Sequence, residues 1–148
     1  MRIVVTRTIH VPVDVVFQTV ADIRRFSQAL PHVVKVEFLS EAKSGVGTRF
    51  RETRLMNGKE AVTELKVTEF VENDRVRLVA DSHGTVWDTV FTVKPENERT
   101  LLTITMDARA YRLFARIINL LIGGMVKKGV ERDMDLVKAF CEAYGGTQ

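Results

Sequence analysis

The chain has 148 residues, 45% of them apolar, and a formal charge of +3 from 22 Lys and Arg against 19 Asp and Glu. This length and composition predict one domain, residues 1–148, around one hydrophobic core. The basic residues are scattered among acidic ones, which argues against a nucleic-acid partner. The single cysteine, Cys141, excludes an internal disulfide, and the chain does not open on a signal-like apolar stretch, so we expect a cytoplasmic location.

The N-terminal part is predicted to be a strand followed by two short helices. Residues Arg2–Ile9 are rich in β-branched side chains, which is typical of a strand. Pro12 fixes φ and Asp14 faces the positive end of a helix, so the first helix should begin there. A second helix is predicted over Ile23–Leu30, and it ends before Pro31 because a residue preceding proline disfavours α geometry.

The central part is predicted to be a run of antiparallel strands. Between Val33 and Ala110 the apolar residues alternate with a period of two, and short turn signals interrupt them. The six predicted strands are Val34–Leu39, Thr48–Met56, Lys59–Phe70, Arg75–Asp81, Thr85–Val93 and Thr100–Ala108. Because the connections are short, successive strands should pair antiparallel.

Residues Tyr111–Tyr144 are predicted to form one helix, about 45 Å long, that lies across the sheet. Its second half carries an apolar stripe made of Val126, Val130, Met134, Val137, Cys141 and Tyr144. Its first half, Leu113–Met125, is apolar almost all round but too short to span a membrane. We expect the first two helices to cover its far side; the alternatives are a homodimer surface, a ligand entrance or contact with a lipid surface. Gly123 and Gly124 should serve a close approach, a bend or space for a ligand.

The Asn57–Gly58 pair predicts a two-residue type I′ turn, which fixes the register of the two strands beside it. This register turns one set of side chains inward: Phe50, Glu52, Arg54, Thr63, Leu65 and Val67. On the outer face it places Arg51 opposite Glu64 as an exposed ion pair. The same alternation directs a second set inward from the other strands: Val34, Val36, Phe38, Val76, Leu78, Ala80, Trp87, Thr89, Phe91, Leu102, Ile104 and Met106. For the first strand, the alternation does not indicate which side chains face inward.

An inward carboxylate needs a partner, and Arg54, two residues along the same face, is the nearest candidate for Glu52. The pair either caps the sheet at an open rim, orients a ligand, or takes part in catalysis. As a buried group Glu52 is the best candidate acid or base. Asp88 and Glu69 are weaker candidates, Asp88 because the alternation points it outward. Trp87 is either ordinary core or a pocket wall whose indole N–H meets a ligand or Glu52.

No metal site and no cofactor site is expected. His10, His32 and His83 are far apart in the sequence, Cys141 adds no second thiol, and none of them has ligand spacing. We expect all three histidines at the surface. The sequence also lacks the G-x-S-x-G, Walker and G-x-G-x-x-G patterns of hydrolases, nucleotide-binding and dinucleotide-binding proteins.

The order of these elements, and the passages VPVDVVFQTVADIRRFSQALP, GTRFRET, VTEF, GTVWDTVFTV and KKGVERDMDLVKAFCE, resemble the START-like or SRPBCC superfamily. The closest likeness is to the small polyketide cyclase/dehydrase-like proteins. The resemblance implies an α+β helix-grip fold of order β-α-α-β6-α. In this fold a curved, seven-stranded antiparallel sheet and the long C-terminal helix enclose a cavity for lipids, polyketides, sterols or other apolar molecules.

The predicted function is binding or carriage of a small hydrophobic ligand in that cavity. The expected ligand-binding residues are Phe50, Glu52, Arg54, Thr63, Leu65, Val67, Leu78, Trp87, Thr89, Phe91, Ile104 and Met106. One alternative is a cyclase or dehydratase that uses Glu52 as acid or base and Arg54 to polarise a carbonyl. A second is a nonenzymatic interaction or toxin-like role, which would use the apolar first half of the last helix; that half is also where a homodimer would form.

Overall fold

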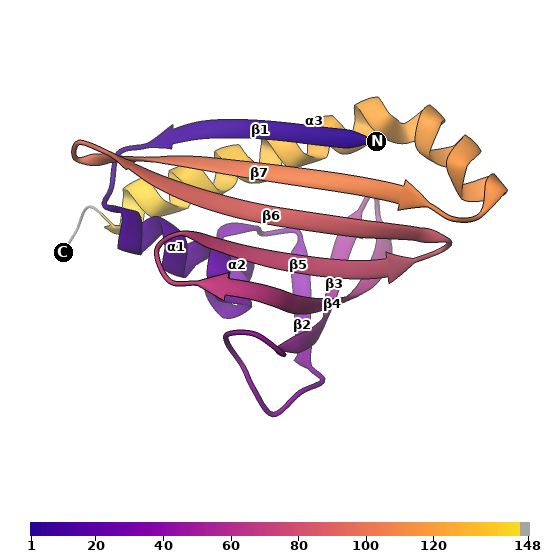
Figure 1. The fold of residues 1–148 in the computed structure, drawn as a ribbon, viewed down its shortest axis with the longest axis horizontal. Coiled ribbons are helices and arrows are strands. Elements are labelled where there is room, and N and C mark those ends of the chain that lie inside the picture. The colour runs from indigo at the N-terminus through magenta and orange to yellow at the C-terminus, as the bar shows by residue number, and fades with distance from the viewer. Residues whose placement is uncertain (146–148) are drawn as a thin grey trace.

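A computed structural model describes residues 1–145 and shows a curved sheet with a long helix lying along it (Figure 1). In chain order the elements are β1 (Arg2–Ile9), α1 (Val13–Ala21), α2 (Ile23–Ala29), β2 (Val33–Phe38), β3 (Arg49–Met56), β4 (Lys59–Val71), β5 (Arg75–Ser82), β6 (Thr85–Glu96), β7 (Arg99–Ala110) and α3 (Leu113–Tyr144). The sheet order is β1-β7-β6-β5-β4-β3-β2, and every neighbouring pair is antiparallel. The predicted seven-stranded sheet and element order are therefore confirmed.

The two helices after β1 explain why the first two strands lie at opposite edges of the sheet. They carry the chain from β1 across to β2, and the remaining strands then return to β1 through short turns. The second half of α3 packs on the inner face of the sheet, where Val130, Met134, Val137 and Cys141 are buried. Tyr144, predicted to belong to this stripe, is instead exposed, and its ring contacts Phe140.

The β3–β4 hairpin has the predicted register. Asn57 and Gly58 both have positive φ, 52° and 77°, as a type I′ turn requires. Glu52 therefore lies opposite Thr63, and Arg51 opposite Glu64. The expected ion pair between Arg51 and Glu64 is wrong, however, because Glu64 Oε1 accepts its hydrogen bond from Arg49 at 3.0 Å.

Val34 is the one predicted inward residue that a backbone irregularity turns outward. The pairing of β2 with β3 shifts between Val33 and Lys35, which leaves Val34 as an extra residue, 52% exposed. An extra residue exchanges the two faces of a strand. Val36 and Phe38 lie beyond the shift, opposite Glu52 and Phe50, and so keep their predicted side.

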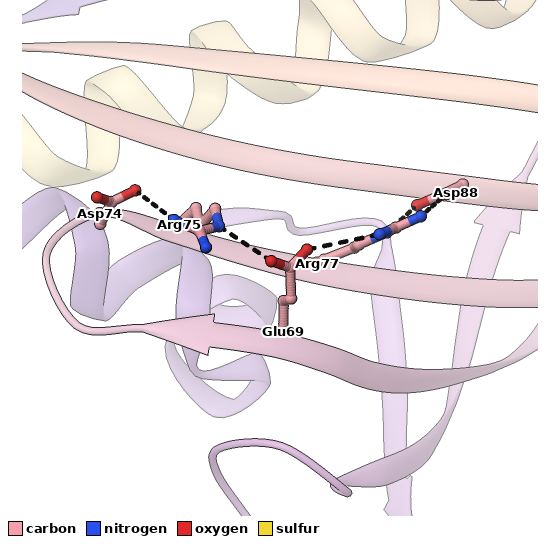
Figure 2. A network of polar contacts seen from close by, with 5 residues as sticks. All are labelled: Glu69, Asp74, Arg75, Arg77 and Asp88. Carbon is pink, nitrogen blue, oxygen red and sulfur yellow. Dashed lines mark hydrogen bonds and ion pairs between the residues drawn. The ribbon is translucent and has the colours of Figure 1, made fainter.

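A network of ion pairs covers the outer face of β4, β5 and β6 (Figure 2). Arg77 Nε donates to Asp88 Oδ1 at 2.8 Å, and Arg75 Nε donates to Glu69 Oε1 at 3.1 Å. The hydrogen bonds from Arg77 hold the pKa of Asp88 below its usual range. Asp88 thus points outward as predicted, and both weaker candidates, Asp88 and Glu69, lie in this surface network.

The first half of α3 is not covered by the first two helices, contrary to the expectation. Leu113, Phe114, Leu120 and Leu121 are between 73% and 86% exposed. The reason is position: α1 and α2 lie near the opposite end of α3 (Figure 1). Gly123 serves a close approach, since a Cβ there would lie 3.2 Å from the sulfur of Met1. Within residues 1–145, no helix has the length and hydropathy needed to cross a membrane.

Candidate functional site

The sheet, the helices and the β2–β3 loop enclose a cavity of about 960 Å³. The wall includes every residue predicted to face a ligand: Phe50, Glu52, Arg54, Thr63, Leu65, Val67, Leu78, Trp87, Thr89, Phe91, Ile104 and Met106. Strand alternation places them there, because each lies on the inner face of β3 to β7. Apolar side chains of the helices complete the wall: Val20, Phe26, Ile118, Ile122 and Val126.

The aromatic part of the wall comes from β6. Phe91 makes an edge-to-face contact with Phe26 of α2, with ring centroids 5.6 Å apart, which closes this side of the cavity. Trp87 is partly buried and also lines the cavity. Of the two alternatives for Trp87, ordinary core or pocket wall, its place in the lining favours the pocket wall.

A buried charged cluster interrupts the apolar wall. Arg54 Nε donates to Glu52 Oε1 at 2.6 Å, and Arg54 Nη1 donates to Asp133 Oδ2 of α3 at 2.7 Å. The predicted pairing of Glu52 with Arg54 is confirmed. Glu52 is only 6% exposed, which argues against a pair that merely caps an open rim. We call Glu52, Arg54, Asp133 and the adjacent His32 the charged cluster.

Arg54 carries the positive charge that allows two carboxylates to lie in this wall. Burial by itself lowers the pKa of the guanidinium, but the charges and hydrogen bonds of Glu52 and Asp133 outweigh burial and raise it overall. Arg54 is therefore protonated. Both of its pairs are largely shielded from water, with side-chain exposures of 26% for Arg54 and 16% for Asp133.

His32 was expected at the surface, and the structure shows this expectation to be wrong. Its Nε2 lies 3.3 Å from Arg54 Nη1 and 3.2 Å from Asp133 Oδ1. Helix α2 ends at Ala29 and β2 begins at Val33, which pairs with Arg54, so His32 is brought beside the guanidinium. Burial is the main cause that lowers the pKa of His32, and Asp133 opposes it only in part. The imidazole is therefore neutral at pH 7.

One oxygen of the cluster has no hydrogen-bond donor. Asp133 Oδ1 is buried, and although His32 Nε2 is near, the two are not aligned for a hydrogen bond. A neutral imidazole carries one N–H hydrogen. If Nε2 of His32 accepts a hydrogen bond from Arg54, that hydrogen is on Nδ1, and Nε2 has none to donate to Asp133. Arg132 also lines the cavity beside Asp133, and its charge, like that of Arg54, lowers the pKa of His32. The acceptor of the charged cluster that lacks a donor is the buried Oδ1 of Asp133.

Sequence reasoning missed Asp133, although helical spacing contains a signal for it. Asp133 follows Val130 by three residues and precedes Val137 by four, so it borders the apolar stripe of α3. Among residues 1–145, no group of three or more His, Cys, Asp and Glu side chains is arranged to hold a metal ion. The chemical groups of this site are thus a guanidinium, two carboxylates and an imidazole.

Several solved structures share this fold over nearly their whole length. The Thermus thermophilus protein TTHA0849 is 18% identical and matches 100% of both chains with a TM-score of 0.80. The Zhui aromatase/cyclase from Streptomyces sp. R1128 is also 18% identical, with a TM-score of 0.78 over 96% of this chain and 93% of its own. A START superfamily protein from Mycobacterium smegmatis is 17% identical, with a TM-score of 0.72 over 98% and 97%.

These likenesses show the helix-grip fold, and at such identities they show the fold alone. No curated protein matches the sequence. The family model described as polyketide cyclase / dehydrase and lipid transport matches residues 1–142, nearly the whole chain. The chain therefore belongs to the polyketide cyclase/dehydrase and lipid transport family.

Proposed function

We propose that this protein binds and carries a small hydrophobic ligand, with the polar end of the ligand at the charged cluster. The observation that carries the proposal is an apolar cavity of about 960 Å³ with a charged cluster in its wall. This volume lies near the upper end of the roughly 300–1,000 Å³ typical of small-molecule sites. Apolar contact supplies affinity at about 25 cal/mol per Å² removed from water, and the cluster supplies orientation.

The charged cluster favours a ligand with a hydrogen-bond donor over a ligand with a carboxylate. Asp133 lines the cavity, and a turn of its carboxylate toward the ligand would let the buried Oδ1, which has no donor, accept from a hydroxyl or amine. A carboxylate would instead meet Glu52 and Asp133 while Arg54 is already engaged by both. Because unpaired charge is expensive inside a protein, this difference favours a neutral polar end at the charged cluster.

A cyclase or dehydratase is the second candidate, and the neutral imidazole of His32 beside two carboxylates is the observation in its favour. His32 or Glu52 would accept a proton next to a carbonyl of a polyketide-like substrate. Both Nε and Nη1 of Arg54 are occupied by carboxylates, which weakens the expected role of Arg54 in polarising that carbonyl. Glu52→Gln should abolish turnover of such a substrate and leave the fold intact.

Native mass spectrometry of protein purified from its own host tests the carrier proposal, followed by extraction and identification of the bound molecule. We expect an adduct with a long apolar part and a hydroxyl or amine. Asp133→Asn should reduce retention of the adduct. The matched control is Asp135→Asn, because Asp135 is two residues along α3, exposed, and paired with Arg7 instead. Protein that carries no molecule and binds none offered to it would contradict the proposal.

A further inference from the structure

The first half of α3 presents a group of exposed apolar side chains that nothing in the described chain covers. The apolar patch consists of Leu113, Phe114, Ile117, Leu120, Leu121 and Met125, each between 50% and 86% exposed. We propose that this patch docks the protein on the surface of an anionic phospholipid bilayer. Two members of the patch, Phe114 and Met125, also border the cavity, but the proposal does not depend on which molecule occupies it.

The charge around the patch points to an anionic surface. Residues 109–128 contain Arg109, Arg112, Arg116, Lys127 and Lys128 and no Asp or Glu. Since the chain has 22 basic and 19 acidic residues, removing these five leaves 17 basic against 19 acidic in the other 128 residues. All of the positive excess of the protein therefore lies in this segment. Basic residues near an anionic leaflet are attracted to it.

The arrangement of these residues is that of a helix lying in a membrane interface. Ile117, Leu120 and Leu121 follow helical spacing and share one face. Arg116 and Lys127, eleven residues or about three turns apart, flank that face on one side. An interfacial helix buries its apolar face at the boundary between headgroups and acyl chains and keeps its basic side chains at the headgroups. A nucleic acid would use the basic residues but leave the leucines without a partner.

A second copy of the chain fits this surface poorly. A symmetric dimer brings the same patch of both subunits together, so Arg116 and Lys127, which flank the patch, would lie near the same basic residues of the other subunit. Like charges in contact oppose association. A bilayer with anionic headgroups covers the same leucines and attracts the same basic residues.

The patch is backed directly by the cavity wall. Ile118, Ile122 and Val126 on the inner side of the same helix half line the cavity. The start of the helix is also held to the sheet, because Asn119 Nδ2 donates to Thr85 Oγ1 at 3.2 Å and the backbone N–H of Tyr111 donates to the carbonyl of Gly84 at 2.9 Å. Docking through the patch would therefore place one helix between the bilayer and the cavity.

Co-sedimentation with vesicles of phosphatidylcholine, alone or mixed with phosphatidylglycerol, tests this proposal. We expect wild-type protein to bind the mixed vesicles at low salt, to bind neutral vesicles weakly, and to be released as salt rises. Arg116→Gln and Lys127→Gln should each weaken binding about fivefold. Leu120→Ser with Leu121→Ser should weaken it about a hundredfold or more. The control is Val62→Ser on β4, which removes an exposed apolar side chain outside the patch.

Three results would overturn the proposal. Wild-type protein that stays in the supernatant with anionic vesicles at low salt shows that the patch does not dock on lipid. A leucine double variant that is folded by circular dichroism and binds as tightly as wild type shows that the apolar face is not used. A wild-type dimer in sedimentation velocity that the double variant converts to monomer shows that a second copy is the occupant.

Discussion

Replacing Arg54 with Met should strongly destabilise the fold, because Arg54 is the guanidinium that pairs with both carboxylates of the charged cluster. Without it, Glu52, only 6% exposed, and Asp133 remain in the wall without the guanidinium that hydrogen-bonds both of them. Removal of one partner from a buried ion pair costs about 3–5 kcal/mol. For a chain of this size that is a fall in the unfolding temperature of about 10 °C or more. Urea denaturation followed by the fluorescence of Trp87, the only tryptophan, gives the free energy.

The matched control is Arg49→Met on the same strand. Arg49 bonds Glu64 at 3.0 Å, but both side chains are about half exposed, so the loss should stay below about 1 kcal/mol. A triple variant, Glu52→Gln, Arg54→Met and Asp133→Asn, removes all three charges together and should recover most of the lost stability, since neutral replacement of buried ion pairs is often tolerated. If Arg54→Met and Arg49→Met lower the free energy of unfolding by equal, small amounts, burial of the Arg54 ion pairs does not determine their contribution to stability.

Three further predictions concern the cluster, a turn and the cavity. The folded-state pKa of His32 lies below the ordinary 6.5, so the unfolded chain binds a proton first and the free energy of unfolding falls as pH drops below about 6.5. His32→Gln should flatten that fall in urea titrations at several pH values. The same dependence on pH in wild type and His32→Gln would contradict the role of His32. Gly84→Ala should lower the free energy of unfolding by at least about 1 kcal/mol, because φ is +85° and the new Cβ would lie 2.8 Å from the Arg112 side chain. Gly58→Ala, with positive φ but open space, should lower it less in the same denaturation assay. The reverse order would argue against the contact between residue 84 and Arg112. Ala80→Phe, at a buried position on the cavity wall, should fill space and abolish ligand retention in native mass spectra with little change in melting temperature; full retention would contradict the cavity as the site.

Local patterns in this chain were sufficient to predict most of the fold. The β-branched composition of Arg2–Ile9 indicated the first strand, and periodicity and turn signals indicated the other six. The Asn57–Gly58 turn alone determined that Glu52 and Arg54 share the inner face. The error at Val34 has a physical cause, because nothing in an alternating sequence marks where a bulge inserts one extra residue. The register could likewise place Glu64 opposite Arg51 but could not choose between Arg51 and Arg49 as its ionic partner.

The charged cluster was only half predictable because its members come from three separate elements. Glu52 and Arg54 share a strand, and their proximity follows from a period of two. Asp133 on α3 reaches them only because the helix crosses the inner face of the sheet, and His32 only because the chain turns sharply between α2 and β2. Contacts between elements depend on their three-dimensional packing, which local sequence patterns do not specify.

Energy transfer from Trp87 to a bound polyene tests the central claim most directly, because Trp87 lines the cavity and is the only tryptophan. A long-chain conjugated polyene alcohol should quench Trp87 saturably with one molecule bound. Under the proposal that a ligand hydroxyl donates to Asp133, it should bind more tightly than the polyene acid of equal length. Asp133→Asn should reduce this preference, whereas Asp135→Asn should leave it unchanged. If neither polyene quenches Trp87 saturably in the wild-type protein, the cavity does not bind hydrophobic ligands of this kind and the proposed function is wrong.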